Sequence, residues 1–104
     1  MSKIVENVSA MIAETISEFV VHQPDLLEVC CDLGDVAVVL LHYAHDVPNE
    51  AHWLDWRKSG FPHVRLECTW HKQPGVPREI HLSLESDAGC LCQQYTSQVD
   101  VESN

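Results

Sequence analysis

Basic side chains are scarce in the first half of this 104-residue sequence, where Lys3 is the only one that precedes Arg57. Ten acidic side chains lie in the same stretch, so residues 1–56 carry a formal charge of −9, and the whole chain carries −10. Nucleic-acid binding needs several cations that face phosphates without opposing carboxylates. The composition therefore argues against direct binding of DNA or RNA.

Long apolar runs are also missing. The longest, Val36 to Leu41, is far shorter than the roughly 18 residues that a membrane-spanning helix needs. The N-terminal segment has a single positive charge and is interrupted by Glu6, Glu14 and Glu18, which is unlike a secretory signal peptide. We therefore expect a cytoplasmic protein with no membrane partner.

An even number of cysteines and the motifs typical of enzymes are both lacking. An odd number of cysteines without an export signal favours free thiols or metal ligands over a set of disulfides. The chain has no P-loop, no GxGxxG, no GxSxG and no HExxH motif. We therefore expect no enzymatic activity. The five cysteines are Cys30, Cys31, Cys68, Cys90 and Cys92.

The residues that are present predict one α+β domain over residues 1–96 and a flexible acidic tail over residues 97–104. Apolar residues recur at three- and four-residue steps over about residues 3–21, which predicts an amphipathic helix packed on a sheet. Alternating apolar and polar residues predict strands over 63–71 and 78–85. A further strand is expected over 90–96, giving a small antiparallel sheet of three to four strands.

The middle of the chain allows more than one interpretation. Residues 25–33 are compatible with a short helix that begins at Pro24 and ends at Gly34, or with a strand that turns there. The valine-rich run 36–43 favours a buried strand, although its period does not exclude a helix. Asn49 is a possible N-cap, which predicts a short helix near residues 50–58.

Acidic side chains and aromatic anchors occur together between residues 25 and 57. Trp and Arg are favoured at protein interfaces, and Trp53, Trp56 and Arg57 would share one face of a helix, although the two tryptophans could instead seal a small core. We expect this stretch to dock on a basic patch of a protein partner, including a patch that normally holds nucleic acid. The candidate partner-binding residues are Asp25, Glu28, Asp32, Asp35, Asp46, Glu50, Trp53, Asp55, Trp56 and Arg57.

In size and charge the chain is similar to small acidic proteins of phages and mobile elements, including nucleic-acid mimics and anti-CRISPR proteins. The resemblance is one of composition, and no sequence motif carries it. It implies a non-enzymatic protein that binds and inhibits a partner. An adaptor, immunity or subunit protein acting as a homodimer is an alternative, because many proteins are acidic for solubility alone.

A zinc-binding protein is the alternative from a different class. Cys68, His71, Cys90 and Cys92 would supply the four soft ligands that a tetrahedral zinc site needs. On a regular strand, however, Cys68 and His71 would face opposite sides of the sheet. We therefore expect no cofactor and keep zinc as the alternative.

Two further groups of residues could carry chemistry: a candidate thiol nucleophile and a second candidate metal site. Thiolate catalysis by Cys30 or Cys31, with His22 or His42 as the base, is disfavoured because the nearby carboxylates oppose thiolate formation. Three members of a second candidate metal site would share a face only if their segment were helical. That site comprises His42, His45 and Asp46, with Glu50 and His52 nearby.

Overall fold

The computed structural model of the chain describes residues 3–21, 23–87 and 92–99, with side chains at residues 10, 12–21 and 23–87. In these residues, helices come first in the chain and strands follow, which confirms the α+β class and the N-terminal helix. The elements are α1 (Lys3–Val20), the 3₁₀ helix η1 (Pro24–Val29), α2 (Cys30–Asp46), β1 (His52–Trp56), β2 (Val64–His71), β3 (Arg78–Ser86) and β4 (Cys92–Val99).

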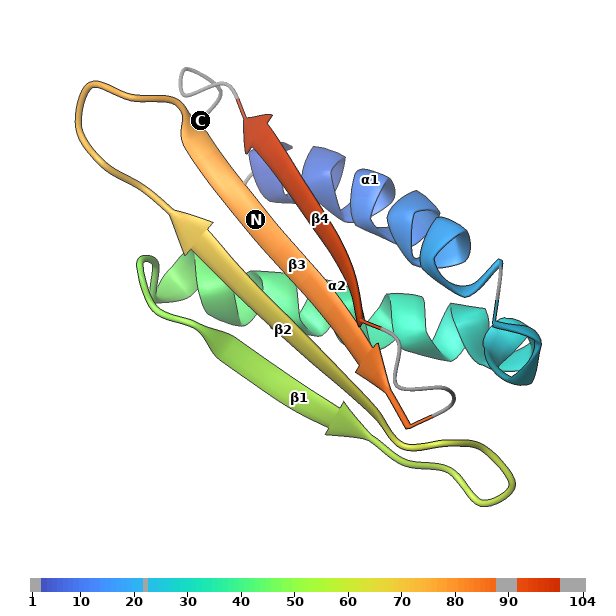
Figure 1. Cartoon of the computed structure of the whole chain (residues 1–104). Coiled ribbons are helices and arrows are strands. Elements are labelled where there is room, and N and C mark those ends of the chain that lie inside the picture. Colours follow the sequence, from blue (N-terminus) through green and yellow to red (C-terminus); the bar gives the residue numbers. More distant parts are fainter. Residues whose placement is uncertain (1–2, 22, 88–91, 100–104) are drawn as a thin grey trace.

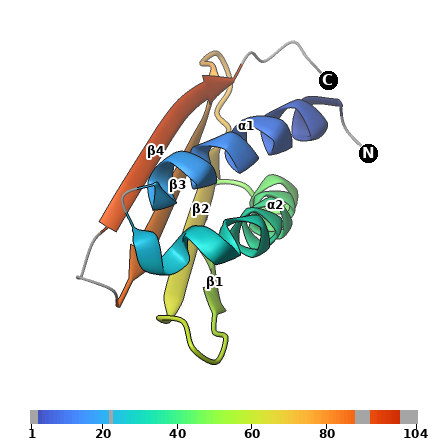
Figure 2. The same ribbon diagram turned by 90° about the vertical axis from the view of Figure 1, so that its right-hand side faces the viewer.

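The four strands form one antiparallel sheet in the order β1-β2-β3-β4, so each strand pairs with its neighbour in the chain (Figure 1). Both helices lie on the same face of this sheet (Figure 2). There α2 packs against β1, β2 and α1, while α1 runs along the β3–β4 side. No described segment covers the opposite face of the sheet.

The core lies between the helices and the sheet. Alternation in β2 and β3 buries every second side chain and leaves Arg65 and Glu67 on the outer face, as predicted. Pairing of Leu66 with Leu84 and of Cys68 with Leu82 aligns the buried rows of the two strands. The helices contribute Ile12, Ile16, Phe19, Val20, Leu33, Ala37, Leu40, Leu41 and Ala44 to the same core.

The prediction of a buried strand over residues 36–43 is wrong, because the segment belongs to α2. A helical period divides it into two faces: Leu40 and Leu41 are fully buried, whereas Val39 and Tyr43 are exposed. A helix does begin near Pro24, as one of the two interpretations held, but it continues through residue 34. A continuously apolar run carries no period of its own, so its packing against α1 and the sheet decided the outcome.

The prediction of a short helix near residues 50–58 is also wrong, because His52–Trp56 form strand β1. Trp53 and Asp55 are exposed, while the alternate side chains are half-buried against the core side. Pairing with β2 outweighs the local helix signals here. Asn49 does not cap a helix: its side chain accepts a hydrogen bond from the Lys72 backbone N–H (2.9 Å) and donates one to the Lys72 carbonyl (3.0 Å).

The C-terminal end differs in extent from the prediction. Residues 97–99, expected in the acidic tail, belong to β4. Residues 100–104 of that expected tail lie outside the described residues. Within the described residues, no helix is long and apolar enough to cross a membrane.

Candidate protein-docking surface

One side of α2 presents apolar and acidic side chains to solvent. Val39 and Tyr43 are 44% and 48% exposed and lie one helical turn apart. Asp32 and Asp35 precede them and Asp46 follows them, all exposed on the same side of the helix. We call Asp32, Asp35, Val39, Tyr43 and Asp46 the α2 face. At a rise of 1.5 Å per residue it is about 21 Å long.

The α2 face is part of a wider asymmetry of charge. The helical layer, residues 3–46, holds eight acidic and one basic side chain, a formal charge of −7. The sheet layer, residues 52–99, holds five of each and is formally neutral. All described carboxylates of the helical layer are exposed: Glu14, Glu18, Asp25, Glu28, Asp32, Asp35 and Asp46.

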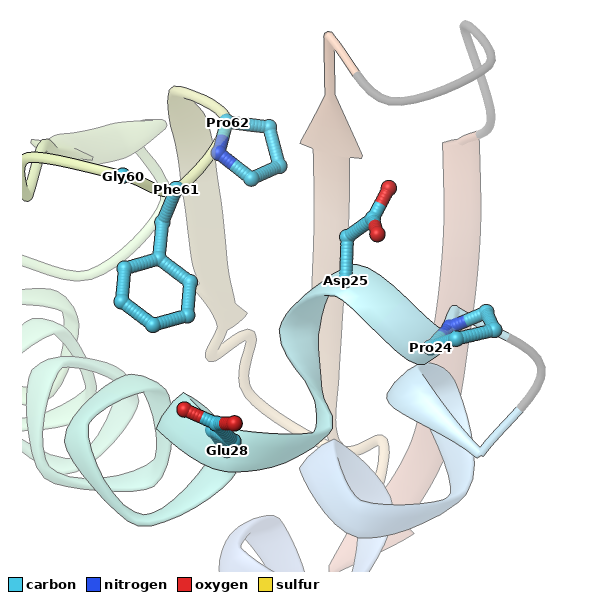
Figure 3. A pocket seen from close by; sticks show the side chains of 6 residues that line it. All are labelled: Pro24, Asp25, Glu28, Gly60, Phe61 and Pro62. Atoms are coloured by element: carbon cyan, nitrogen blue, oxygen red, sulfur yellow. The ribbon is translucent and has the colours of Figure 1, made fainter.

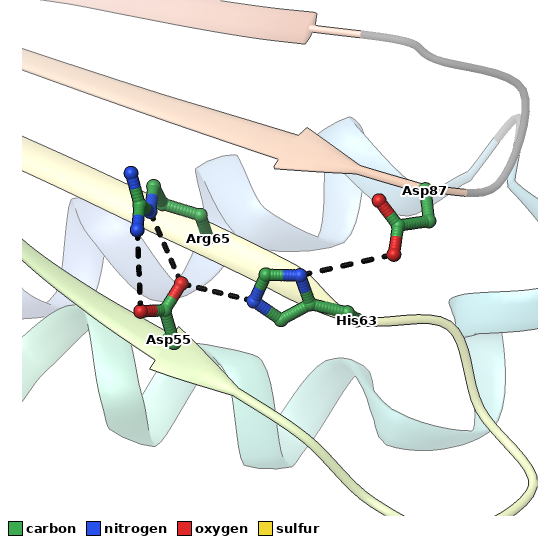
Figure 4. A network of polar contacts seen from close by, with 4 residues as sticks. All are labelled: Asp55, His63, Arg65 and Asp87. Atoms are coloured by element: carbon green, nitrogen blue, oxygen red, sulfur yellow. Dashed lines mark hydrogen bonds and ion pairs between the residues drawn. The ribbon is translucent and has the colours of Figure 1, made fainter.

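In the sheet layer, Asp55, Glu79 and Asp87 each lie within ion-pair distance of a basic or titratable side chain. Arg65 donates from Nε to Asp55 Oδ1 (3.0 Å), and His63 Nε2 lies 2.9 Å from the same oxygen (Figure 4). The other ring nitrogen of His63 is 3.8 Å from Asp87 Oδ2. Hydrogen bonds from Arg65 first, and then from His63, hold the pKa of Asp55 below its ordinary value. This network links β1 to β2 at the edge of the sheet. Because Asp55 is already bonded by Arg65 and His63, its carboxylate is less available to a partner.

The acidic candidates other than Asp55 lie near the two ends of α2. Asp25 and Glu28 lie on η1, at the same end of the molecule as Asp32 and Asp35. Asp46 lies at the opposite end of α2, and Glu50 follows it in the loop before β1. The structure therefore brings the carboxylates of residues 25–46 into the helical layer.

The aromatic candidates do not join that surface. Trp53, 55% exposed, lies on the outer face of β1, whereas Trp56 points to the core side with its ring centroid 6.1 Å from that of Phe61. The expectation that Trp53, Trp56 and Arg57 share one face is wrong, because a strand alternates its side chains. Trp56 instead packs against the core, the other role expected for it.

Val39 and Tyr43 were missed by sequence reasoning. Assigning residues 36–43 to a buried strand placed both side chains in the interior. Helical spacing of Asp35, Val39 and Tyr43 at four-residue steps was the available signal, and it has meaning only once the segment is known to be a helix.

Of the four zinc candidates, the structure describes the side chains of Cys68 and His71, and these lie on opposite faces of the sheet. Cys68 is 1% exposed and faces the core, whereas His71 lies on the outer face with its ring centroid 4.8 Å from that of His81. Burial raises the pKa of the Cys68 thiol to about 12, which opposes the thiolate form that binds metal. Cys90 and the side chain of Cys92 lie outside what the structure describes.

In the second candidate metal site, His45 Nδ1 lies 3.8 Å from Asp46 Oδ1, but His45 and His52 also have other contacts. The ring centroid of His45 lies 4.8 Å from that of Trp70, and His52 Nε2 lies 2.8 Å from the carbonyl oxygen of Val47. Burial first, and then Lys72, lowers the pKa of His45, so its neutral form is favoured. Across the described residues, no three Cys, His, Asp or Glu side chains are placed to hold a metal ion.

The vicinal cysteines show no sign of an activated thiol. The pKa of Cys31 is raised, first by Cys30 and more weakly by Asp35 and Asp32. A catalytic thiolate needs the opposite shift. His22, one of the two proposed bases, lies outside the described residues.

Compared with known proteins, the chain matches no family model, no curated protein and no solved structure. An inference about its function must therefore rest on the geometry described above.

Proposed function

We propose that this chain is a non-enzymatic cytoplasmic binding protein that docks through the α2 face on a basic surface of a protein partner. The segregation of charge carries the proposal: the helical layer bears a formal −7 and the sheet layer none. A net negative charge that serves solubility does not require the carboxylates to be concentrated in one layer. The helical layer exposes seven described carboxylates, and three of them lie on the α2 face with the exposed Val39 and Tyr43.

The chemistry of the α2 face fits the anatomy of a protein interface. Val39 and Tyr43 would lose their water and form the centre of the contact, with the Tyr hydroxyl free to find a partner. The carboxylates at both ends would meet Arg and Lys side chains at the rim, where charge speeds encounter and fixes orientation. Binding should therefore weaken steeply as salt is added.

A partner whose basic groove normally holds nucleic acid is the class that fits best. Carboxylates accept the same Arg and Lys hydrogen bonds as phosphates do. Occupation of such a groove would inhibit the partner, as the compositional similarity to acidic inhibitors of phages and mobile elements implies. Self-association through the α2 face is less favourable, because it would bring like charges together.

Two charge-reversal variants test the proposal. The α2-face variant carries Asp32→Lys, Asp35→Lys and Asp46→Lys. The matched control carries Glu67→Lys, Glu79→Lys and Glu85→Lys on the sheet, with the same change in net charge. Tagged chains are used to capture partners from the native host, and the affinity is then measured with purified components.

We expect the α2-face variant to lose at least about a hundredfold in affinity, because each reversal replaces attraction by repulsion. The control should keep most of its binding. Equal affinity of the α2-face variant and the wild type would refute the proposal. Light scattering at micromolar concentration should give the mass of one chain, and a dimer dispersed by the α2-face variant would favour the homodimer instead.

A further inference from the structure

A hollow of about 590 Å³ lies between η1 and the loop that joins β1 to β2 (Figure 3). It brings together an aromatic ring, two prolines and two carboxylates from segments that are distant in the sequence. The lining residues are Pro24, Asp25, Glu28, Gly60, Phe61 and Pro62.

Local structure places these groups around the hollow. A 3₁₀ helix has three residues per turn, so Asp25 and Glu28 project from the same side of η1. In Figure 3 the Phe61 ring extends from the loop toward Glu28, while Asp25 projects from the beginning of η1. The loop can turn back here because Gly60 has a positive φ of 89°, which glycine adopts without strain.

The loop that joins β1 to β2 contacts the helical layer through Lys58. The Phe61 backbone N–H donates to the Lys58 carbonyl (3.0 Å), and Lys58 Nζ lies 3.6 Å from Asp32 Oδ2. The same Nζ lies 5.8 Å from the centroid of the Phe61 ring. The chain therefore already holds one cation with a carboxylate and this ring.

Within the part of the chain that the structure describes, the two carboxylates of the hollow have no such cation. Among the described residues, neither Asp25 nor Glu28 forms an ion pair. Lys58, three residues before Phe61, is already held by Asp32. Two exposed carboxylates beside an aromatic ring attract a cation, which can also stack on the face of the ring.

We propose that this hollow binds one arginine side chain of a basic partner. A guanidinium is planar, so it can stack on Phe61 while its N–H groups donate to Asp25 and Glu28. The two prolines would pack against its methylene stem. The identity of the partner rests on the proposed function, whereas the binding of arginine to the hollow is testable by itself.

Nuclear magnetic resonance titration tests this site. N-acetyl-arginine methylamide is added to the isotope-labelled chain, and N-acetyl-citrulline methylamide serves as its neutral isostere. We expect saturable shifts at Glu28, Gly60 and Phe61 with a Kd of about 1 mM, and no response to citrulline. An equal response to citrulline, or to N-acetyl-lysine methylamide, would overturn the assignment to arginine.

A double variant locates the binding. Asp25→Asn with Glu28→Gln should abolish the saturable shifts, since both carboxylates are lost. Glu14→Gln with Glu18→Gln, the same change in charge on α1, should leave them intact. Both pairs are exposed, so the fold should survive. Shifts that persist in the first variant, or that vanish in both, would contradict the site.

The two proposals fail separately. A reduced α2-face variant with Asp35→Lys and Asp46→Lys alone keeps Asp25, Glu28, Phe61 and the ion pair of Asp32 with Lys58, so it should bind the arginine amide as the wild type does even if it has lost the partner. Loss of arginine binding in that variant would show that general charge, rather than the hollow, attracts the ligand.

Discussion

The two layers of the molecule differ in how many of their carboxylates have a charged or titratable partner. In the sheet layer, Asp55 is shared by Arg65 and His63, and Glu79 Oε1 lies 3.0 Å from His81 Nε2. In the helical layer, two of the seven described carboxylates have a charged or titratable partner among the described residues: Asp32 with Lys58 at 3.6 Å, and Asp46 with His45 at 3.8 Å.

The negative charge of the sheet layer is therefore more fully compensated by neighbouring cations than that of the helical layer. Like charges that lack partners repel one another and raise the free energy of the folded chain. The helical layer tolerates that repulsion because its inner side is buried against the sheet. We infer that the buried junction stabilises the fold, while the outward side of the helices is available for recognition.

The largest effect on stability is expected where the layers meet, at Trp70. This residue is fully buried, with His45 at its edge and Lys72 Nζ 5.4 Å from its ring centroid. Trp70→Ala should lower the free energy of unfolding by about 3–5 kcal/mol. Trp70→Phe should lose much less, because the indole Nε1 has no hydrogen-bond partner among the described residues. Urea unfolding measures both, and an equal loss would contradict this account.

Two glycines, one in each layer, should respond in opposite directions. Gly34 lies inside α2 with no atom within 4 Å of an added Cβ, so Gly34→Ala should raise the free energy of unfolding by about 0.5–1 kcal/mol. Gly60 has a φ of +89°, so Gly60→Ala should lower it by about 1 kcal/mol. Thermal unfolding of the two variants decides, and a destabilised Gly34→Ala would mean that the helix is packed more tightly there.

Neutralising Asp55 should cause a smaller loss that depends on pH. The folded state lowers the pKa of Asp55, so its contribution to stability is present above the ordinary carboxyl pKa of about 3.9 and disappears as the pH falls through the lowered value. Asp55→Asn should therefore be less stable than the wild type at pH 7, and the difference should shrink in strong acid. Asp35→Asn, from the helical layer, is the control and should not be destabilised. A constant deficit at every pH would exclude the ionic explanation.

The smallest effect on stability is expected on the α2 face itself. Val39→Ser and Tyr43→Ser should each change the free energy of unfolding by no more than about 0.5 kcal/mol, because both side chains are exposed. Their buried neighbour provides the contrast, since Leu40→Ala should lose about 2–5 kcal/mol. A large loss for Tyr43→Ser would show that this side chain supports the fold rather than a partner contact.

Elements whose two faces differ could be predicted, and elements without such a contrast could not. The segments of α1, β2 and β3 carry a clear helical or alternating period, and all three were expected. The run over 36–43 is almost entirely apolar, so it shows no hydrophobic period. The segment of β1 was assigned to a helix because local capping signals contain no information about pairing with a distant strand. Asp32, Asp35 and Asp46 of the α2 face were named from charge alone, whereas Val39 and Tyr43 depended on knowing the helix.

The sequence by itself determined the net charge, the scarcity of basic residues before Arg57 and the positions of the strongly periodic elements. These properties are local or additive, so no folding is needed to know them. Only the tertiary structure decided that the acidic residues gather in one layer, that Val39 and Tyr43 face outward among them, and that η1 meets the loop carrying Phe61. Those juxtapositions arise from packing and strand pairing between distant segments, and local periodicity contains no information about them.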